Sequence, residues 1–274
     1  MLIKFSKMHG LGNDFVVIDA INQQIDLSAA QIKNMADRHY GIGFDQMLLV
    51  KLAQGTADFR YVIYNADGSE VSQCGNGARC FALFVHKHGL SDKQSIRVET
   101  NTGEIVLNMS GDVVEVNMGV PTFLPVEIPL ATPAELTQYD VDIDNQTVHF
   151  SALSIGNPHA VIQVDDIAQA PLESQGKNLE SHAIFPERAN IGFSQIINRS
   201  EIALRVYERG AGETQACGSG ACAAVIAGIE LGKLTSPVKV ALTGGSLSIS
   251  WKGRGAPVVM TGPATFVFDG TIEL

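Results

Sequence analysis

The sequence contains the same stretch of residues twice, and this repeat constrains the fold more than any other feature. Residues 74–78 read CGNGA and residues 217–221 read CGSGA. Further matches follow in the same order and at nearly the same spacing: 12–13 with 156–157, 42–46 with 191–195, Tyr64 with Tyr207, and Phe123 with Phe266. A shared order and spacing indicates one domain that has been duplicated, rather than a solenoid of short repeats.

Length and composition agree with two domains of ordinary size. The chain has 274 residues, of which 45% are apolar and 18% charged, which suffices for two cores without disulfide bonds. A net charge of −10 argues against a nucleic-acid partner. No apolar run reaches bilayer length, and the first residues lack the apolar region of a signal peptide. We therefore expect a cytoplasmic protein without a nucleic-acid or membrane partner, in which thiols stay reduced.

Each copy follows one plan of short strands and a central helix. The β-branched runs 15–18 and 160–164 predict strands. A helix is expected to start at each repeated cysteine and to stop at Gly89 or Gly232. The second of these helices is apolar almost all round, which is typical of a helix inside a core. The sequence therefore predicts an α+β fold of two pseudo-symmetric domains, each a mostly antiparallel sheet or barrel wrapped around a central helix.

Another helix is expected early in the first copy. Ser28 and Gln31 have the spacing of a capping box, and Gly41 is expected to end the helix. The corresponding stretch of the second copy, near 172–185, carries a weaker helical pattern. Glycines at 244–245 and 253–255 predict hairpin turns between late strands.

A cysteine followed by Gly-X-Gly at a helix start predicts an anion site beside a reactive thiol. The first N–H groups of a helix lack intrahelical partners, and the helix dipole is positive there. Glycine lets a ligand approach the backbone closely, and the same field favours the thiolate form of cysteine. Substrate is expected to contact the residues that follow the two cysteines, namely Gly75, Asn76, Gly218 and Ser219.

Two such sites in one duplicated chain suit the inversion of a carbon that carries hydrogen, carboxylate and ammonium. One group must remove the proton from one face, and a second group must return a proton to the opposite face. Cys74 and Cys217 are the candidates for this pair. The helix starts would stabilise the charge that builds up on the carboxylate, so that neither pyridoxal phosphate nor a metal is required.

Other interpretations of the four cysteines explain less of the sequence. Cys80 and Cys222 fall within the helix bodies and are expected to be small buried residues. The cysteine spacings fit neither a zinc site with a nearby histidine pair nor a redox CxxC motif. A cysteine hydrolase would leave the second Cys-Gly-X-Gly segment unexplained.

Three long segments resemble the signatures of bacterial diaminopimelate epimerases: 7–15 (KMHGLGNDF), 65–80 and 207–222. The resemblance covers essentially the whole chain and includes 156–159 (GNPH) and Asn190. It implies reversible conversion of LL-diaminopimelate to the meso form by a two-base mechanism, in lysine and peptidoglycan precursor synthesis, without a cofactor. It further implies a homodimer, an active site in the cleft between two domains, and a last strand that returns to the first domain. The domain boundaries carried over are 1–117 plus 263–274, and 118–262.

The repeat also shows where the two copies differ. The distal end of the substrate has no symmetric counterpart in the site, so we expect the residues that differ between the copies to bind it. The differing pairs are Asn65 with Glu208, Ala66 with Arg209, Gly41 with Asn190, and Phe15 with His159. Arg209 suits a carboxylate, and the resemblance implies that it lies with Asn65, Asn157 and Asn190 around the distal end of the substrate. Glu208 and His159 are further candidates, as partners for the ammonium groups and for proton transfer at the thiols. Asn13 and Gln46 complete the expected substrate-binding set.

Several alternatives stay open at the level of sequence. Glu208 and Arg209 could form a surface ion pair, His159 could be an ordinary loop histidine, and Asn13 could support a turn. The alternative reaction is racemisation of another amino acid, such as proline or hydroxyproline, although proline racemases have different cysteine motifs. An alternative of another class is a non-catalytic thiol or anion-binding module.

Overall fold

A computed structural model describes residues 1–71, 74–101 and 103–274, so Ser72 and Gln73, beside the first repeated cysteine, and Thr102 lie outside the described residues. The chain divides into two compact units. Unit 1 consists of Met1–Asn117 and Thr261–Leu274, and unit 2 of Met118–Met260. The boundaries proposed from sequence, at 117/118 and 262/263, stay a prediction about the duplicated domains. Among the described residues, none of the helices is long and apolar enough to cross a membrane.

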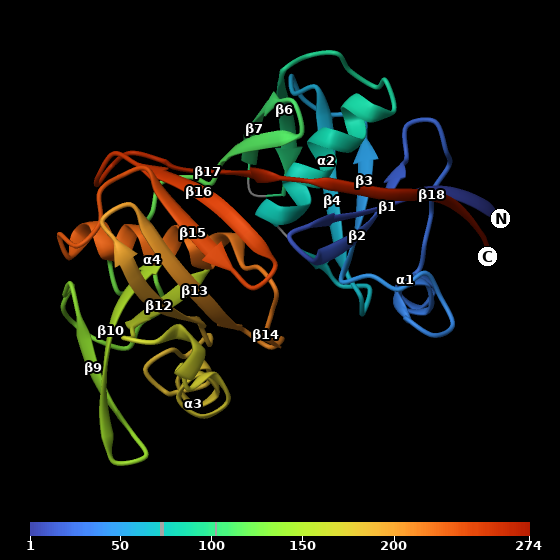
Figure 1. The fold of residues 1–274 in the computed structure, drawn as a ribbon. Coiled ribbons are helices and arrows are strands. Elements are labelled where there is room, and N and C mark those ends of the chain that lie inside the picture. The colour runs from blue at the N-terminus through green and yellow to red at the C-terminus, as the bar shows by residue number, and fades with distance from the viewer. Residues whose placement is uncertain (72–73, 102) are drawn as a thin grey trace. The chain divides into compact units, whose positions relative to one another are not determined.

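Unit 1 is a mixed sheet whose strands run in the order β18, β1, β2, β3, β4, β6, β7, β8. Most neighbours are antiparallel, but β2 pairs with β3 and β4 with β6 in parallel. The last strand, β18, lies antiparallel to β1, so both chain ends lie at one place (Figure 1). The strand bounds are β1 Leu2–Gly10, β2 Asn13–Asp19, β3 Gln46–Lys51, β4 Phe59–Asn65, β5 Glu70–Val71, β6 Ser95–Thr100, β7 Gly103–Ser110, β8 Val113–Asn117 and β18 Thr265–Glu273.

Unit 2 repeats this plan. Its strands run in the order β9, β10, β11, β12, β13, β15, β16, with parallel pairs β11–β12 and β13–β15 at the corresponding places. The predicted α+β fold with two copies of one domain is therefore confirmed. The strand bounds are β9 Tyr139–Ile143, β10 Gln146–Ser154, β11 Pro158–Gln163, β12 Asn190–Asn198, β13 Glu201–Glu208, β14 Gly212–Glu213, β15 Val238–Leu242 and β16 Gly245–Trp251. The strand β17, Val258–Pro263, begins in unit 2 and ends in unit 1.

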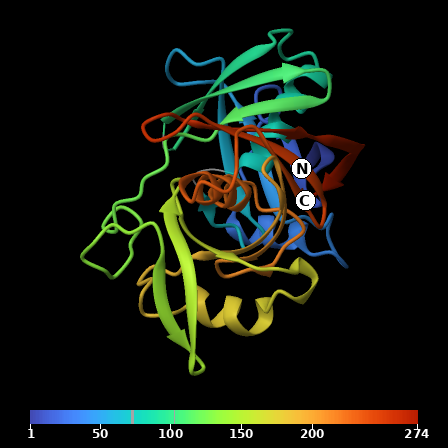
Figure 2. The ribbon, with the colours of Figure 1, turned by 60° about the vertical axis from the view of Figure 1, so that its left-hand side comes forward.

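Each unit has one helix inside its strands, and each of these helices begins directly after a repeated cysteine. The helix α2 spans Gly75–Lys87 and contacts β1, β2, β3, β7, β8 and β18. The helix α4 spans Gly218–Glu230 and contacts β10 to β13, β15 and β16. Figure 2 looks almost along the orange coil of α4. Both helices end as predicted, before a left-handed glycine, Gly89 with φ +65° and Gly232 with φ +71°.

The early helix of unit 1 is shorter than the sequence predicted. The capping box of Ser28 and Gln31 is present, and α1 spans Ala29–Ala36. The expected end at Gly41 is wrong, because Asp37 leaves the helical conformation and its carboxylate accepts the N–H groups of His39 and Tyr40. The weaker pattern in unit 2 corresponds to two short helical turns, Ile167–Gln169 and Leu172–Gly176, followed by α3 at Lys177–Glu180.

The glycines of the first repeated motif also serve the packing of α2. A Cβ atom at Gly77 would lie 2.2 Å from the Tyr61 hydroxyl oxygen, which itself donates a hydrogen bond to the Cys74 carbonyl at 3.3 Å. Tyr61 lies on β4 and is almost fully buried. The helix start therefore fits against its own sheet only without a side chain at this position.

We expect Gly77→Ala to lower the free energy of unfolding by about 1–3 kcal/mol, because the added methyl group overpacks the contact with Tyr61. Denaturant unfolding measures this change. Gly55→Ala is the matched control: its Cβ would meet only a Glu99 carboxylate oxygen at 4.0 Å, so its effect should stay within about 0.5 kcal/mol. Equal losses in the two variants would contradict this account of the helix packing.

Candidate functional site

Cys74 is the N-cap residue of α2, and its sulfur contacts polar groups of Gly77 and Asn13. The Gly77 N–H donates to Sγ at 3.4 Å, and Sγ donates to Asn13 Oδ1 at 3.9 Å. The same Asn13 oxygen accepts a hydrogen bond from Asn76 Nδ2 at 3.2 Å. Cys74 is half-buried, whereas Asn76 is buried within the first turn of the helix. The structure thus brings Asn13, Cys74 and Asn76 together, three residues that the sequence predicts as candidate site residues.

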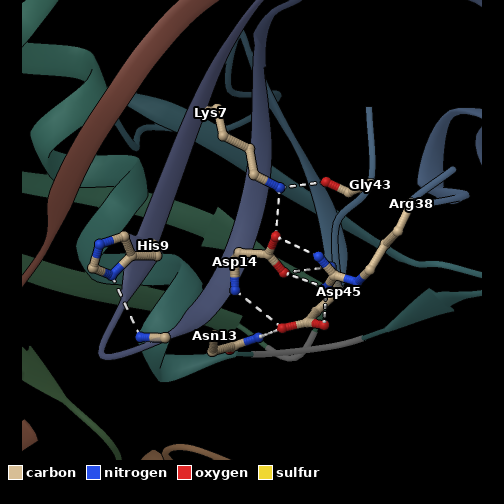
Figure 3. A network of polar contacts seen from close by, with 8 residues as sticks. Lys7, His9, Asn13, Asp14, Arg38, Gly43 and Asp45 are labelled. Atoms are coloured by element: carbon tan, nitrogen blue, oxygen red, sulfur yellow. Dashed lines mark hydrogen bonds and ion pairs between the residues drawn. The ribbon is translucent and has the colours of Figure 1, made fainter. Parts of the chain in front are cut away.

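A charged network lies directly behind Asn13 (Figure 3). Asp14 accepts two hydrogen bonds from Arg38, at 2.7 and 3.0 Å, and one from Lys7, whose ammonium group also contacts the Gly43 carbonyl. Arg38 bridges to Asp45 at 2.8 Å. Burial raises the pKa of the Asp14 carboxyl, but the hydrogen bonds from Arg38 and Lys7 outweigh it and hold this pKa well below its ordinary value. Asp14 is therefore a fixed anion at neutral pH.

Gln46 and Asn65 lie opposite each other on neighbouring strands of unit 1. Gln46 Nε2 donates to Asn65 Oδ1 at 3.0 Å, and Asn65 Nδ2 donates to Ser69 Oγ at 3.1 Å. The Gln46 Oε1 atom is buried and accepts no hydrogen bond from any residue that the structure describes. A buried acceptor without a partner is costly unless a ligand or water satisfies it, which supports a binding role for Gln46.

Cys217 is the N-cap residue of α4 and is 4% exposed. Its Sγ lies 3.7 Å from Ser219 Oγ. Burial and the Glu208 carboxylate raise the pKa of the Cys217 thiol well above its ordinary value, although the Gly220 N–H and the Ser219 hydroxyl act in the opposite direction. Burial and a nearby carboxylate therefore oppose the stabilisation of the Cys217 thiolate that a helix start is expected to provide.

A second asparagine lies beside Cys217 and is held by a histidine. His159 Nε2 donates to Asn157 Oδ1 at 3.0 Å, and Asn157 Nδ2 donates to Ser219 Oγ at 3.3 Å. Burial, followed by the charge of Arg209, lowers the pKa of His159 to about 3. His159 is therefore a neutral, buried side chain on β11 at physiological pH rather than an ordinary loop histidine. Four predicted residues, His159, Asn157, Ser219 and Cys217, form one chain of contacts.

The Glu208–Arg209 segment is held by buried polar side chains. Asn190 accepts the Arg209 N–H at 3.0 Å and donates to the Pro158 carbonyl at 3.2 Å. Glu208 accepts a hydrogen bond from Thr214, and Arg209 donates from its guanidinium to the Glu187 carbonyl at 3.2 Å. The Arg209 side chain is exposed, which leaves it accessible to a ligand.

Sequence reasoning missed the residues that support these side chains. Glu180 is 2% exposed and accepts the Gly210 N–H at 2.9 Å, next to Arg209, while Arg188 contacts its other carboxylate oxygen at 3.0 Å. Lys7 and Asp14 belong to the segment 7–15, but their pairing with Arg38 is formed only by the fold. Nothing in the sequence around Glu180 indicates that this carboxylate would be buried. In the described residues, His, Cys, Asp and Glu side chains form no group of three or more that could hold a metal ion.

The four thiols should react with an alkylating agent in the order of their exposure and acidity. Cys74 is half-buried and should react first, followed slowly by Cys217; Cys80 and Cys222, both 0% exposed, should be protected. Burial also raises the pKa of Cys80. Timed N-ethylmaleimide treatment with peptide mass spectrometry measures the order, with urea-unfolded protein as the control for equal intrinsic reactivity. Labelling of Cys80 or Cys222 as fast as Cys74 in folded protein would be inconsistent with these helix positions.

Solved structures of related fold show that both units belong to a known architecture. A phenazine biosynthesis protein of the PhzF family from Bacillus anthracis matches with a TM-score of 0.70 at 14% identity, covering 100% of both chains. A hydroxyproline epimerase from Agrobacterium vitis matches with a TM-score of 0.71 at 14% identity, covering 99% of this chain and 92% of that one. At this identity the likeness concerns the fold alone.

Sequence comparison identifies the family. The family model described as diaminopimelate epimerase matches residues 5–124 and 151–267. A diaminopimelate epimerase from Nitrosospira multiformis is 56% identical over 275 residues, covering 100% of this chain and 99% of that protein. The diaminopimelate epimerase from Nitrosomonas europaea is 55% identical over 276 residues, covering 100% of both chains. With two cysteine-capped helices in duplicated units and a full-length match of this strength, the chain belongs to the diaminopimelate epimerase family.

Proposed function

We propose that this protein reversibly converts LL-2,6-diaminopimelate to meso-diaminopimelate, a step in lysine and peptidoglycan precursor synthesis. The observation that carries the proposal is the equivalent placement of Cys74 and Cys217, each as N-cap of the central helix of its unit. Family membership supports the same reaction. A non-catalytic thiol or anion-binding module would not require two equivalent thiols. Proline has no distal carboxylate, so proline racemisation would not require Arg209 in its proposed binding role.

The proposed chemistry uses the two thiols on opposite faces of one α-carbon. The thiolate of one cysteine removes the α-proton, and the thiol of the other donates a proton to the opposite face, so that each turnover exchanges their protonation states. Charge moves from carbon onto the adjacent carboxylate as the proton leaves. The N–H groups at the two helix starts, at Gly75 and Asn76 and at Gly218 and Ser219, would stabilise that charge. This scheme requires neither pyridoxal phosphate nor a metal ion.

The remaining site residues have proposed roles in binding. Arg209 binds the distal carboxylate with the help of Asn65, Asn157 and Asn190. Glu208 binds an ammonium group, which would also reduce the effect of its charge on the neighbouring thiol. For His159 we propose a positioning role through Asn157 rather than proton transfer, because a group with a pKa of about 3 is a weak base at neutral pH.

The cellular context is part of the proposal as well. A cytoplasmic location suits an enzyme that needs two free thiols, and all four cysteines are unbridged. A homodimer is supported by the exposed apolar side chains of the last strand, Val267 at 51% and Phe268 at 46% exposure.

Incubation in deuterated water tests the reaction. With LL-diaminopimelate and no added cofactor, the wild-type protein should introduce α-deuterium and form the meso isomer, and Cys74→Ala and Cys217→Ala should each abolish meso formation without unfolding. L-Proline should remain unlabelled. Treatment with a chelator should leave the rate unchanged. Full turnover in either folded alanine variant would exclude the two-base mechanism, and labelling of L-proline alone would identify a proline racemase.

Arg209→Met should weaken substrate binding by about 2 kcal/mol, or roughly thirtyfold, because a charge-assisted contact to the distal carboxylate is lost. The dissociation constants for LL-diaminopimelate and for L-lysine, which lacks that carboxylate, measure the effect. Arg205→Met is the matched control. Arg205 lies on β13, close to Arg209 in sequence, but its guanidinium is paired with Glu213 at 2.7 Å. Equal losses for both ligands in Arg209→Met would contradict the assigned role.

A further inference from the structure

The Asn13 side chain makes contacts that fix which way its amide points. Its Nδ2 group donates to Asp45 Oδ2 at 2.9 Å, and its Oδ1 accepts from Asn76 Nδ2 and from Cys74 Sγ (Figure 3 shows the Asp45 side). An ionised carboxylate only accepts hydrogen bonds, and an amide nitrogen only donates them. Asp45 therefore requires the NH2 group on its own side, and this directs the oxygen of Asn13 toward the Cys74 thiol.

Asp45 is itself held by a reciprocal clasp with Asp14. The Asp14 N–H donates to Asp45 Oδ2 at 3.0 Å, and the Asp45 N–H donates to Asp14 Oδ1 at 3.1 Å and to the Asp14 carbonyl at 3.0 Å. The Arg38 guanidinium bridges the two carboxylates. Because two carboxylates this close repel one another, the bridging cation is what makes the arrangement stable. Asp45 keeps its place although its side chain is 45% exposed.

The equivalent place in unit 2 is built differently. The repeat aligns Asp14 with Pro158 and Asp45 with Ser194, so the clasp has no counterpart there. Asn157, the partner of Asn13 in the repeat, accepts from His159 and turns its NH2 group toward Ser219, beside Cys217. The two asparagines are therefore turned in opposite senses. Cys74 faces a carbonyl oxygen, whereas Cys217 lies beside the hydroxyl of Ser219.

We propose that Asp45, held by Asp14 and Arg38, is a positioning residue that keeps the Asn13 oxygen directed at the Cys74 thiol. Cys74 therefore has a hydrogen-bond acceptor that Cys217 lacks at the equivalent asparagine. This inference rests on the proposed function for its catalytic meaning. Removing the acceptor at position 45 leaves the Asn13 amide held by the hydrogen bond from Asn76 and the contact with Cys74, so that it can rotate more easily. When the amide rotates, the S–H group of Cys74 loses the Asn13 oxygen as an acceptor, and an N–H group can approach the sulfur instead, which favours the thiolate.

The test follows alkylation of Cys74 against pH in a Cys217→Ser background, where the only other cysteines are fully buried. Asp45→Ala should move the midpoint of alkylation to lower pH by about half a unit, or about threefold in rate at a fixed pH below the midpoint. Asn13→Ala should move it in the same direction, and the double variant should show no further shift. With both catalytic cysteines present, Asp45→Ala should lower kcat/KM roughly tenfold.

Three variants complete the design. Asp45→Asn retains one carbonyl oxygen for Asn13 and should restore most of the wild-type behaviour. Asp58→Ala is the control for loss of a carboxylate elsewhere in unit 1. Asp58 pairs with Lys93 and accepts the Arg97 N–H, and its removal should leave the midpoint of Cys74 alkylation unchanged. If circular dichroism shows that Asp45→Ala folds poorly, Asp45→Ser replaces it. The serine side chain is shorter than that of aspartate, so its hydroxyl should not reach the Asn13 amide.

An unchanged midpoint in folded Asp45→Ala, or shifts that add in the double variant, would overturn the proposal. An unchanged midpoint in Asn13→Ala would likewise overturn it, by showing that Asn13 does not act on the thiol. These alkylation midpoints do not depend on turnover. A wild-type protein without α-deuterium exchange would instead refute the proposed function, and the two failures are distinguishable.

Discussion

The start of the central helix is the constraint on which the rest of each unit depends. A helix that is buried on nearly all sides must have its unpaired first N–H groups satisfied. In both units a cysteine is the N-cap residue and small residues follow it. In unit 1 the Cys74 side chain accepts the Gly77 N–H, and Gly77 leaves room for Tyr61, whereas the Cys217 side chain makes no cap hydrogen bond in unit 2. Because the strand before the helix and the glycine after it are also repeated, the two thiols take equivalent places in the two sheets.

The two units share one backbone plan, but a few polar side chains give the two cysteines different surroundings. In unit 1 the asparagine beside the cysteine is held by an acceptor, Asp45, and in unit 2 by a donor, His159. Each of these partners is stabilised by its surroundings, the first by a bridging guanidinium and the second by burial that keeps it neutral. Two thiols on a symmetric frame can therefore have different proton affinities without any difference in the helix or the sheet.

Much of the fold and part of the site could be predicted from the sequence, because both depend on local or repeated patterns. The duplication, the two cysteine-capped helices and their terminal glycines follow from residues near one another in the chain. The end of α1 was missed because Asp37 competes for backbone N–H groups that a helix would otherwise use. Asp45 and Glu180 were missed because their partners are distant in sequence, so that only the folded sheet brings their charges into contact.

The proton affinity of Cys217 shows why burial and charge must be considered together with helix position. A helix N-terminus alone would lower the pKa of this thiol, yet burial and the Glu208 carboxylate raise it. The carboxylate has this effect only while its charge is uncompensated. A cation bound to Glu208 would offset this repulsion, while burial would still oppose the thiolate that the Gly220 N–H and the Ser219 hydroxyl favour. The proposed binding of an ammonium group by Glu208 would therefore link ligand binding to the ionisation of the thiol, because a cationic ligand would remove one of the causes that raise the pKa of Cys217.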